Sequence, residues 1–419
     1  MNTIFVQIAS YRDPQLLPTL EDMFLKAKYP KNLKICIAWQ HSEEDEWDTL
    51  EKYLNDGRFI IIDIPYKESL GVCWARNQIQ QHYNGEKYTL QLDSHHRFVK
   101  NWDVELIKMV KDLQKKGYKK PLLTAYASSF NPDNDPAERN NIPWKMNFDR
   151  FTPEGVVFFL PAAIDNFKEL KEPISARFYS AHFAFTLGKF CEEVQHDPNY
   201  YFHGEEISIA VRAYTYGYDL FHPHKVIVWH EYTRRGRTKH WDDDTNWRYI
   251  NDRTFPLLKI LLGIDNTDNS EERRRVLGKY NLGKERTLQE YEKYSGIRFK
   301  DRAVQDYTLS NNLAPNPIYN TEQEYESHFV KEFKHCIDLS YEQVSEKDYE
   351  FWAVAFHDKN DQTIYRHDAT KEEIYSLYND PDGYIKLWRK FETSILPSYW
   401  VVWPYSTSKG WCKRLIGLL

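Results

Sequence analysis

The chain begins with four short apolar runs, which read TIFVQIAS at residues 3–10, LKICIAW at 33–39, FIIIDI at 59–64 and YTLQL at 88–92. Each run has the composition and length of a buried β-strand. The intervening segments predict helices at residues 18–27, 43–53 and 71–82. Strands that alternate with helices are typical of βαβ units. The sequence therefore predicts an α/β fold with a Rossmann-like, mostly parallel sheet.

The alternating pattern loosens after residue 101. Further strands are expected at residues 122–128, 156–161, 181–187 and 225–229. A helix is expected at 204–216, and the segment 129–149, which is rich in Asn, Pro and Asp, predicts a long surface loop. With a charged helical segment at 271–300, these elements extend the predicted first domain over residues 1–310.

A second, smaller domain is predicted after a linker. Residues 311–317 read NNLAPNP, a composition typical of linkers, and we place the linker at 311–320. Residues 321–419 predict a β-rich accessory module with strands at 351–356, 362–366 and 399–403 and a helix at 371–377. We expect most of four tryptophans in this module to lie in its core; they are Trp388, Trp400, Trp403 and Trp411.

The chain ends with GWCKRLIGLL at residues 410–419, which is short, apolar and basic. Such a segment could make a weak peripheral contact with a membrane surface. The favoured interpretation is a last strand or helix that docks on its own module.

The composition of the 419 residues limits the class of function. Lys and Arg number 56 and Asp and Glu 62, and this net charge of −6 argues against a nucleic-acid partner. The five cysteines form no CxxC pattern, so neither a zinc site nor a disulfide framework is indicated, and a reducing compartment fits. Because we find no signal peptide and no apolar stretch of about 18 residues, we expect a cytoplasmic protein without a transmembrane segment.

A candidate metal site follows the fourth predicted strand. The sequence QLDSHHRF at residues 91–98 places Asp93 and His95 two residues apart, just beyond the strand. Residues i and i+2 of an extended chain project to the same side, and open α/β sheets bind ligands beyond the carboxyl ends of their strands. A carboxylate and an imidazole there could share one divalent ion. Taken alone, the pattern also fits an exposed polar turn.

Two later segments add to this candidate site. The sequence YYFHGEE at residues 200–206 places Glu205 and Glu206 at a predicted helix start, where the helix dipole favours acids. The sequence VIVWHEYTRRGR at 226–237 places His230 at a strand end, ahead of a loop that contains Arg234, Arg235 and Arg237. A histidine can complete a coordination sphere, and arginines bind phosphates through bidentate hydrogen bonds. Together the segments predict a site for a metal and a diphosphate.

These motifs, in this order, resemble a known family. The residues that carry the resemblance are IFVQIASYR at 4–12, GVCWAR at 71–76, DSHHRF at 93–98, NWD at 101–103 and HGEEISIAVRAYTYGYDLFHP at 203–223, ahead of His230. Over residues 1–310 they resemble the cytoplasmic GlcNAc-transferases that modify peptidyl hydroxyproline, with bacterial relatives of unassigned acceptor. More distantly they resemble the mucin-type polypeptide GalNAc-transferases. Both belong to the GT-A class, whereas residues 321–419 extend beyond the family pattern.

The resemblance implies a retaining, metal-dependent transferase that uses UDP-GlcNAc, with Mn²⁺ as the first choice of ion and Mg²⁺ as the alternative. It implies that Asp93, His95 and His230 bind the metal. Glu205 and Glu206 would face the donor sugar and the acceptor hydroxyl. The other residues expected to contact the donor are Ala9, Ser10, Tyr11 and Arg12 at the uridine, Asp93 and Ser94 at the ribose, Arg76 at the diphosphate or the sugar, and Arg234, Arg235 and Arg237 in a flexible loop over the diphosphate.

Several alternatives stay open at this point. The acceptor hydroxyl could belong to a polypeptide or to a glycan, and retention could proceed by attack from the leaving-group face or through a covalent intermediate on Glu205 or Glu206. A UDP-sugar nucleotidyltransferase is one rival, but it would need a glycine-rich loop and a lysine where residues 8–14 read IASYRDP. A non-enzymatic glycan-binding protein would explain the 16% of aromatic residues but would not need a metal site.

Overall fold

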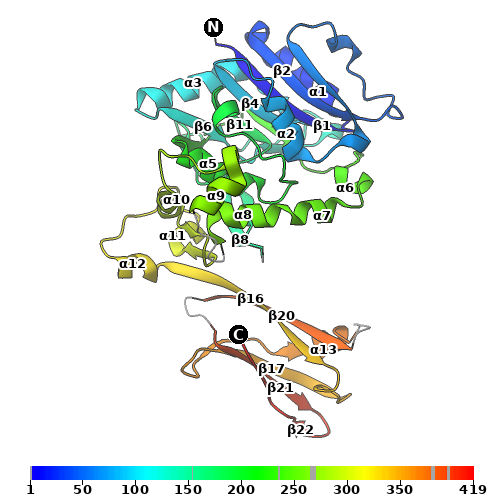
Figure 1. Ribbon diagram of the computed structural model, residues 1–419, viewed down its shortest axis with the longest axis vertical. Helices are drawn as coiled ribbons and strands as arrows, with labels where there is room; N and C mark the ends of the chain where they lie inside the picture. The colour runs from blue at the N-terminus through cyan, green and yellow to red at the C-terminus, as the bar shows by residue number, and fades with distance from the viewer. Residues whose placement is uncertain (1, 153, 235, 265–269, 379–382, 394–396) are drawn as a thin grey trace. The chain divides into compact units, whose positions relative to one another are not determined.

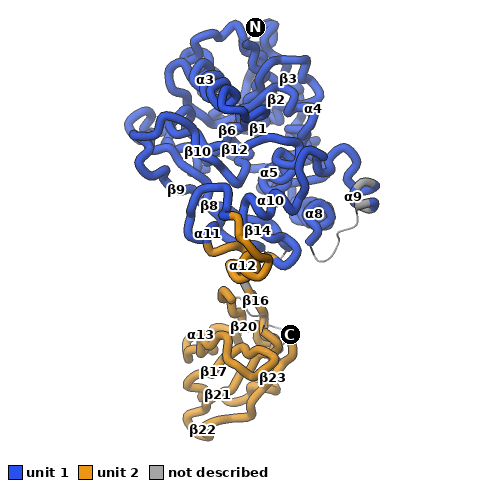
Figure 2. The backbone as a smooth tube through the Cα atoms, turned by 90° about the vertical axis from the view of Figure 1, so that its left-hand side faces the viewer, with its two compact units in different colours: residues 1–301, 307–317 blue, residues 302–306, 318–419 orange. Residues whose placement is uncertain are grey.

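The computed structural model describes residues 2–419 apart from residues 153, 235, 265–269, 379–382 and 394–396 (Figure 1). The chain forms two compact units, which Figure 2 shows in different colours. Unit 1 comprises Met1–Asp301 and Tyr307–Pro317, and unit 2 comprises Arg302–Asp306 and Ile318–Leu419. The functional division predicted from the sequence, with its linker at residues 311–320, stays a prediction.

Unit 1 is built on an eight-stranded sheet in the order β10-β12-β6-β11-β4-β1-β2-β3 (Figure 1). Its strands are β1 (Ile4–Tyr11), β2 (Leu33–His41), β3 (Phe59–Pro65), β4 (Tyr88–Asp93), β6 (Lys120–Thr124), β10 (Ile174–Ser175), β11 (Phe183–Leu187) and β12 (Tyr218–His222). Strands β1 to β4 pair in parallel, as do β6 and β12. Strand β11 is antiparallel to both of its neighbours, β4 and β6, and β10 is antiparallel to β12. The predicted α/β class is confirmed, and its parallel part comes mainly from the first hundred residues.

Helices pack on both faces of this parallel part. They are α1 (Leu16–Lys26), α2 (Val72–Gln80) and α3 (Trp102–Lys115). Ile4 and Val6 of β1 lie in a core cluster with residues of α1 and α3, whereas Phe5 lies in a second cluster with residues of α2. A strand that is buried on both faces needs apolar residues at successive positions, which explains the continuous run TIFVQIAS.

A separate three-stranded sheet, in the order β5-β13-β7, adjoins the end of β4. Its strands are β5 (His96–Phe98), β7 (Ser128–Phe130) and β13 (Val228–Glu231). Strand β13 is antiparallel to β5, with His230 opposite His96. This register brings a residue from late in the chain to the segment that directly follows β4.

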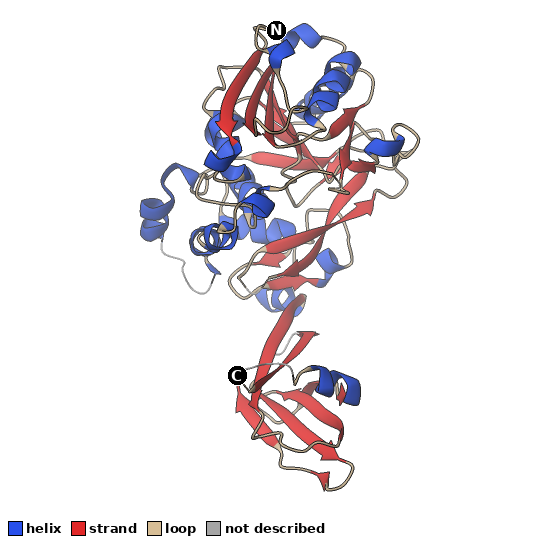
Figure 3. Ribbon diagram, turned by 90° about the vertical axis from the view of Figure 1, so that its right-hand side faces the viewer, coloured by secondary structure: helices blue, strands red, loops and turns tan. Residues whose placement is uncertain are grey.

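The rest of unit 1 is largely helical. Strands β8 (Trp144–Phe151) and β9 (Val157–Ala163) form an antiparallel hairpin. The remaining helices and short strands are α4 (Phe190–Glu193), α5 (Glu205–Thr215), α6 (His240–Asp243), α7 (Trp247–Asp252), α8 (Thr254–Leu262), α9 (Ser270–Leu277), α10 (Leu288–Ser295), β14 (Ile297–Arg298) and α11 (Asp306–Leu309). Figure 3 separates these helices from the strands by colour.

The predicted acidic helix at residues 43–53 is wrong, because within it only Glu51–Tyr53 forms a short 3₁₀ turn. Its acidic side chains bind other parts of the structure instead. Asp48 Oδ1 accepts a hydrogen bond from Trp39 Nε1 at 2.8 Å, and Asp45 pairs with Arg12 at 2.7 Å. Aspartate has a low helix propensity, and contacts with other parts of a fold override the weak helical preference of a short segment.

Four other predicted segments also differ in detail. The single strand expected at 122–128 is divided between β6 and β7, and the expected loop at 129–149 contains the start of β8. The strand expected at 225–229 begins later and extends through His230 to Glu231. The helical segment expected at 271–300 consists of two short helices, α9 and α10. Other strands and helices predicted for unit 1 are confirmed to within a few residues.

Unit 2 is β-rich. It contains β15 (Ala303–Gln305), α12 (Glu322–Ser327), β16 (Phe329–Ser340), β17 (Tyr349–His357), β18 (Thr363–Arg366), β19 (Ala369–Thr370), α13 (Lys371–Ser376), β20 (Tyr384–Thr393), β21 (Tyr399–Ser406), β22 (Gly410–Trp411) and β23 (Leu415–Leu418). The expectation for its four tryptophans is wrong, because Trp388, Trp403 and Trp411 are exposed and only Trp400 packs against the core. The end of the chain pairs with β21 as a strand. Within the described part of the chain, no helix is long and apolar enough to cross a membrane.

Gly71, which precedes α2 in unit 1, provides a test of how the start of this helix packs against Tyr201. Its φ of 102° and ψ of 175° lie in a region that is essentially open only to glycine, and a Cβ there would lie 2.6 Å from Cδ2 of Tyr201. We expect Gly71→Ala to lower the free energy of unfolding by about 1–3 kcal/mol, measured by urea denaturation. Gly57→Ala is the control, since nothing lies within 4 Å of its added Cβ. Equal unfolding midpoints for the two variants would contradict this account.

Candidate active site

A cavity of about 680 Å³ opens at the carboxyl ends of β1 and β4. This edge of a parallel sheet is where open α/β folds bind their ligands, and the volume suits a small molecule. The cavity contains most of the residues that the sequence singles out: Ala9, Tyr11, Arg76, Asp93, Ser94, His95, Glu205, Glu206, His230, Arg234 and Arg237. Residues that are far apart in the chain therefore share one site.

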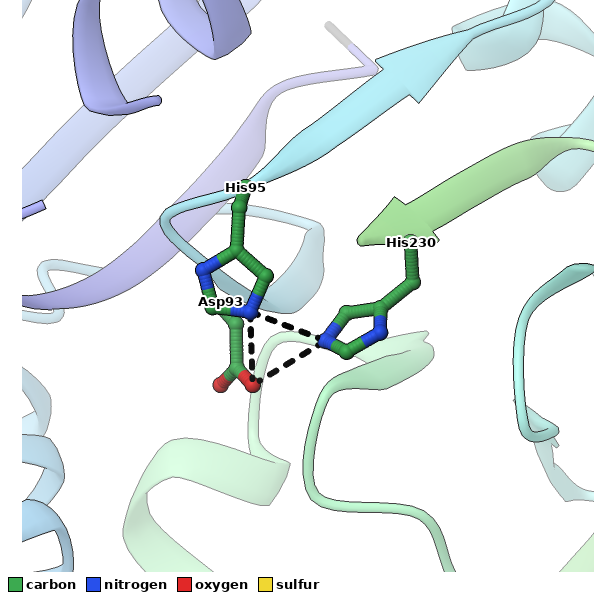
Figure 4. Close-up of side chains that lie close together, drawn as sticks. All are labelled: Asp93, His95 and His230. Carbon is green, nitrogen blue, oxygen red and sulfur yellow. Dashed lines mark hydrogen bonds and ion pairs between the residues drawn. The ribbon is translucent and has the colours of Figure 1, made fainter. Parts of the chain in front are cut away.

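Asp93, His95 and His230 meet at this edge, as Figure 4 shows. The Nε2 atoms of His95 and His230 lie 3.0 Å apart. Asp93 Oδ2 lies 3.4 Å from Nε2 of His230 and 3.7 Å from Nε2 of His95. One donor atom from each residue lies within 4.8 Å of the other two.

The chemistry of these donors fits a divalent cation. Burial, with the neighbouring His182, holds the pKa of His230 well below its usual value, so this ring is neutral. Burial opposes ionisation of Asp93, but His230 and Arg76 hold its pKa well below the usual range. Nδ1 of His230 is buried without a hydrogen-bond partner among the described residues. A carboxylate oxygen and two imidazole nitrogens that converge in this way form a nitrogen and oxygen ligand set typical of transition metals.

Arg76 connects the candidate metal site to the acidic helix α5. Its Nη2 lies 2.6 Å from Asp93 Oδ1, and its Nη1 lies 2.5 Å from Glu205 Oε1. Glu205 also lies 2.8 Å from Nδ1 of His196. Burial opposes ionisation of Glu205, but Arg76 and His196 lower its pKa, so it is an ionised and fixed carboxylate. Both ends of the Arg76 guanidinium are thus occupied by carboxylates.

Glu206 has a different environment although it is the next residue. Its Oε1 accepts a hydrogen bond from the Ala181 amide at 3.0 Å, and its Oε2 accepts one from the Tyr126 hydroxyl at 2.9 Å. Burial raises its pKa to about 7, although these hydrogen bonds oppose the rise. Two acids with such different pKa values are suited to different roles.

Only two of the four residues expected at the uridine line the cavity. Ala9 and Tyr11 line the cavity, and the Tyr11 hydroxyl donates a hydrogen bond to Asp243 at 2.7 Å. Ser10 is fully buried and is not among the lining residues. Arg12 is also not among them and pairs with Asp45 and Asp243. A contact of either residue with a nucleotide therefore stays a prediction.

The arginine-containing loop lies over the same cavity. Arg237 forms ion pairs with Asp13 at 3.1 Å and Glu231 at 3.4 Å. Its Nη1 contacts both ring nitrogens of His95, with 2.8 Å to Nε2. Arg234 lies over the Trp241 ring, 5.6 Å from its centroid. Arg235 lies outside the described residues.

Sequence reasoning missed three residues of this site. His182 stacks on His230 with ring centroids 4.2 Å apart, and Tyr126 binds Glu206. Asp13 accepts hydrogen bonds from Ser94 Oγ and His95 Nδ1. His182 was detectable as a histidine inside an apolar run, but Asp13 precedes a proline and has the pattern of a turn.

The family model described as Glycosyltransferase (GlcNAc) matches residues 3–56 and 46–301 of this chain. No curated protein matches it. A structure of GalNAc-T7 with UDP, GalNAc and Mn²⁺ is 16% identical with a TM-score of 0.45, and the similarity covers 69% of this chain and 56% of that chain. A structure of S. aureus TarS 1–349 with UDP-GlcNAc is 13% identical with a TM-score of 0.38, and the similarity covers 66% of this chain and 71% of that chain. A longer TarS structure is 11% identical, with a TM-score of 0.38 and coverage of 100% and 85%.

The raised pKa of Glu206 predicts a pH dependence of stability. Between its usual pKa of 4.5 and its folded value of about 7, the folded protein binds more protons than the unfolded chain, so stability falls as pH rises. The Glu206→Gln variant has no carboxyl group at this position, so its stability does not fall with rising pH for this reason. We expect the variant to gain stability relative to the unaltered protein over this range, by a total of about 3 kcal/mol, with no further gain at higher pH. Urea denaturation at a series of pH values measures the difference.

Glu205→Gln is the matched comparison and should behave in the opposite way. Since the ionised form of Glu205 stabilises the fold, its removal should cost more stability as pH rises through the usual range of a glutamate. A pH-independent difference for Glu206→Gln would show that its carboxyl titrates normally.

Proposed function

Since the chain belongs to the GlcNAc glycosyltransferase family, we propose that it transfers a sugar, with GlcNAc as the first choice, from a UDP-sugar to a hydroxyl group with retention of configuration. The observation that carries this proposal is the convergence of Asp93, His95 and His230 in a cavity at the end of the sheet. Mn²⁺ is the first ion to test and Mg²⁺ the second.

In this proposal the three converging residues hold the divalent ion. When bound, the ion supplies Lewis-acid stabilisation of the negative charge that develops on the departing diphosphate. Arg234 and Arg237 line the cavity and would add positive charge near the same group. Arg76 keeps the Asp93 carboxylate in place by an ion pair on its other oxygen. The uridine would lie towards Ala9 and Tyr11.

Glu205 and Glu206 would then have separate roles. Glu205 is paired with Arg76 and His196, so its carboxylate orders the site rather than attacking a sugar. Glu206 binds only neutral donors among the described residues, and its raised pKa suits hydrogen bonding with an acceptor hydroxyl. If retention proceeds through a covalent intermediate, Glu206 is the better candidate for the nucleophile, because Glu205 is held in an ion pair and Glu206 has no such pair with any described residue.

The rival functions account for fewer observations. A nucleotidyltransferase would need a glycine-rich loop where β1 is followed by Arg12 and Asp13. A protein that only binds glycans would not need two histidines and a carboxylate in contact at the end of the sheet. The acceptor, polypeptide or glycan, is left to experiment.

We also propose that residues 1–310 form the catalytic domain and 321–419 an accessory module. A cytoplasmic location agrees with the five free cysteines. The pairing of β23 with β21 favours a docked end of the chain over a peripheral membrane contact.

The proposed function predicts metal-dependent hydrolysis of a UDP-sugar by the purified protein. Cleavage is possible without an acceptor because water can take the place of the acceptor hydroxyl. We expect UDP-GlcNAc to be cleaved faster than UDP-GalNAc or UDP-glucose when Mn²⁺ is present. Chelation of the metal should abolish the cleavage, and added Mn²⁺ should restore it. If no UDP-sugar is cleaved and UDP does not bind, the proposal is wrong.

The ligand set predicts which substitutions remove metal binding. Asp93→Asn and His230→Ala should each weaken Mn²⁺ binding to the UDP-bound protein by more than about tenfold, since the first replaces a charged ligand with a neutral one and the second removes a ligand. His224→Ala is the control, because His224 is a half-buried histidine outside the cavity lining. Loss of the free Mn²⁺ signal in electron paramagnetic resonance measures the affinity. Equal affinities of all three variants would exclude this metal site.

A further inference from the structure

Asp13 lies between β1 and α1, is only 3% exposed, and has no part in the chemistry proposed above. Its Oδ1 accepts a hydrogen bond from the Gln15 amide at 2.8 Å. Its Oδ2 accepts from Ser94 Oγ at 2.6 Å and from His95 Nδ1 at 2.6 Å. Arg237 Nη1 lies 3.1 Å from the same oxygen. One buried carboxylate therefore joins the loop after β1, the segment after β4 and the arginine-containing loop.

The contact with His95 determines where that ring carries its proton. An ionised carboxylate only accepts hydrogen bonds, so Nδ1 of His95 must be the donor. A neutral imidazole that is protonated on Nδ1 has its free lone pair on Nε2. This is the nitrogen that lies 3.0 Å from His230 Nε2 and 3.7 Å from Asp93 Oδ2. Arg237 Nη1, which can only donate, lies 2.8 Å from the same Nε2, as an unprotonated nitrogen allows. Asp13 thus leaves on this nitrogen the lone pair that a cation would bind.

We propose that Asp13 is the positioning residue of this site: it holds His95 in the Nδ1-protonated tautomer and in the ring orientation that presents Nε2 to a divalent cation. The inference rests on the proposed function, because it assigns a task within the same metal site. A carboxylate that orients a metal-binding histidine through its other ring nitrogen typically contributes 10- to 100-fold to metal affinity.

A purely structural role for Asp13 makes different predictions. The hydrogen bonds from Gln15 and Ser94 would stabilise the loop whatever the state of the His95 ring. Under that account, the tautomer of His95 is unconstrained, and a substitution of Asp13 affects metal binding only as much as any equally destabilising substitution elsewhere.

The tautomer can be measured directly in the unaltered protein. In ¹⁵N-labelled, metal-free protein at about pH 8, two-dimensional NMR of the histidine rings distinguishes a protonated from an unprotonated nitrogen. We expect His95 to carry its proton on Nδ1 only. A proton on Nε2 would overturn the inference. This measurement needs no variant except one for resonance assignment and does not depend on enzymatic activity.

Asp13→Asn tests the consequence for metal binding. The substitution keeps the size of the side chain but removes its charge and leaves one acceptor oxygen. That oxygen cannot accept from the Gln15 amide and also from Ser94 and His95, which donate to the other carboxylate oxygen. We expect Mn²⁺ affinity of the UDP-bound protein to fall by about 10- to 100-fold. Affinity within about threefold of the unaltered protein would overturn the inference.

Asp103→Asn is the matched control for lost stability. Asp103 is 2% exposed and accepts hydrogen bonds from the amides of Lys28 and Tyr29, away from the cavity. We expect this variant to lose stability but to keep its Mn²⁺ affinity, and an equal loss of affinity in both variants would favour the structural account. If the unaltered protein neither binds Mn²⁺ nor cleaves a UDP-sugar, the proposed function is wrong. If the unaltered protein does both, and the Asp13→Asn variant binds Mn²⁺ with the same affinity, only this inference is wrong.

Discussion

A charge that is buried at the edge of a sheet needs a partner, and Arg76 meets this need for two carboxylates at once. Its guanidinium lies 2.6 Å from Asp93 and 2.5 Å from Glu205, and Arg76 and Glu205 are almost fully buried. Removal of one member of such a group leaves an uncompensated buried charge, which is strongly destabilising. The ion pairs therefore tie α2, the end of β4 and the start of α5 together, and the cavity forms around them.

The same constraint separates the two adjacent glutamates. Consecutive residues of an α-helix point in directions about 100° apart, so Glu205 turns towards Arg76 and Glu206 towards Tyr126. Pairing lowers the pKa of Glu205, and burial raises that of Glu206 to about 7. The sequence presents these residues as an equivalent pair, but their partners make one of them part of the support of the site and leave the other accessible to chemistry.

Local pattern predicted much of the fold but failed where side chains bind distant residues. The apolar runs of β1 to β4 were readable because a strand buried on both faces requires successive apolar positions. Where a helix was expected at 43–53, the side chains of Asp45 and Asp48 instead bind Arg12 and Trp39 in other parts of the fold. The expected strand at 122–128 is split because its two halves join different sheets. The pattern of apolar residues within these segments does not indicate which distant residues they will contact or which sheet they will join.

By itself, the sequence determined which chemical groups follow which strands, because strand periodicity and the residues at strand ends are local properties. Asp93 at the end of β4 and His95 just after it, the acids that open α5, and His230 on a late strand were all accessible in this way. Tertiary structure alone decided that His230 lies beside His95, 135 residues away, through the register of β13 against β5. It also decided the partners of Arg76 and Asp13, because contacts between distant segments depend on how sheets and helices pack and leave no trace in the spacing of residues.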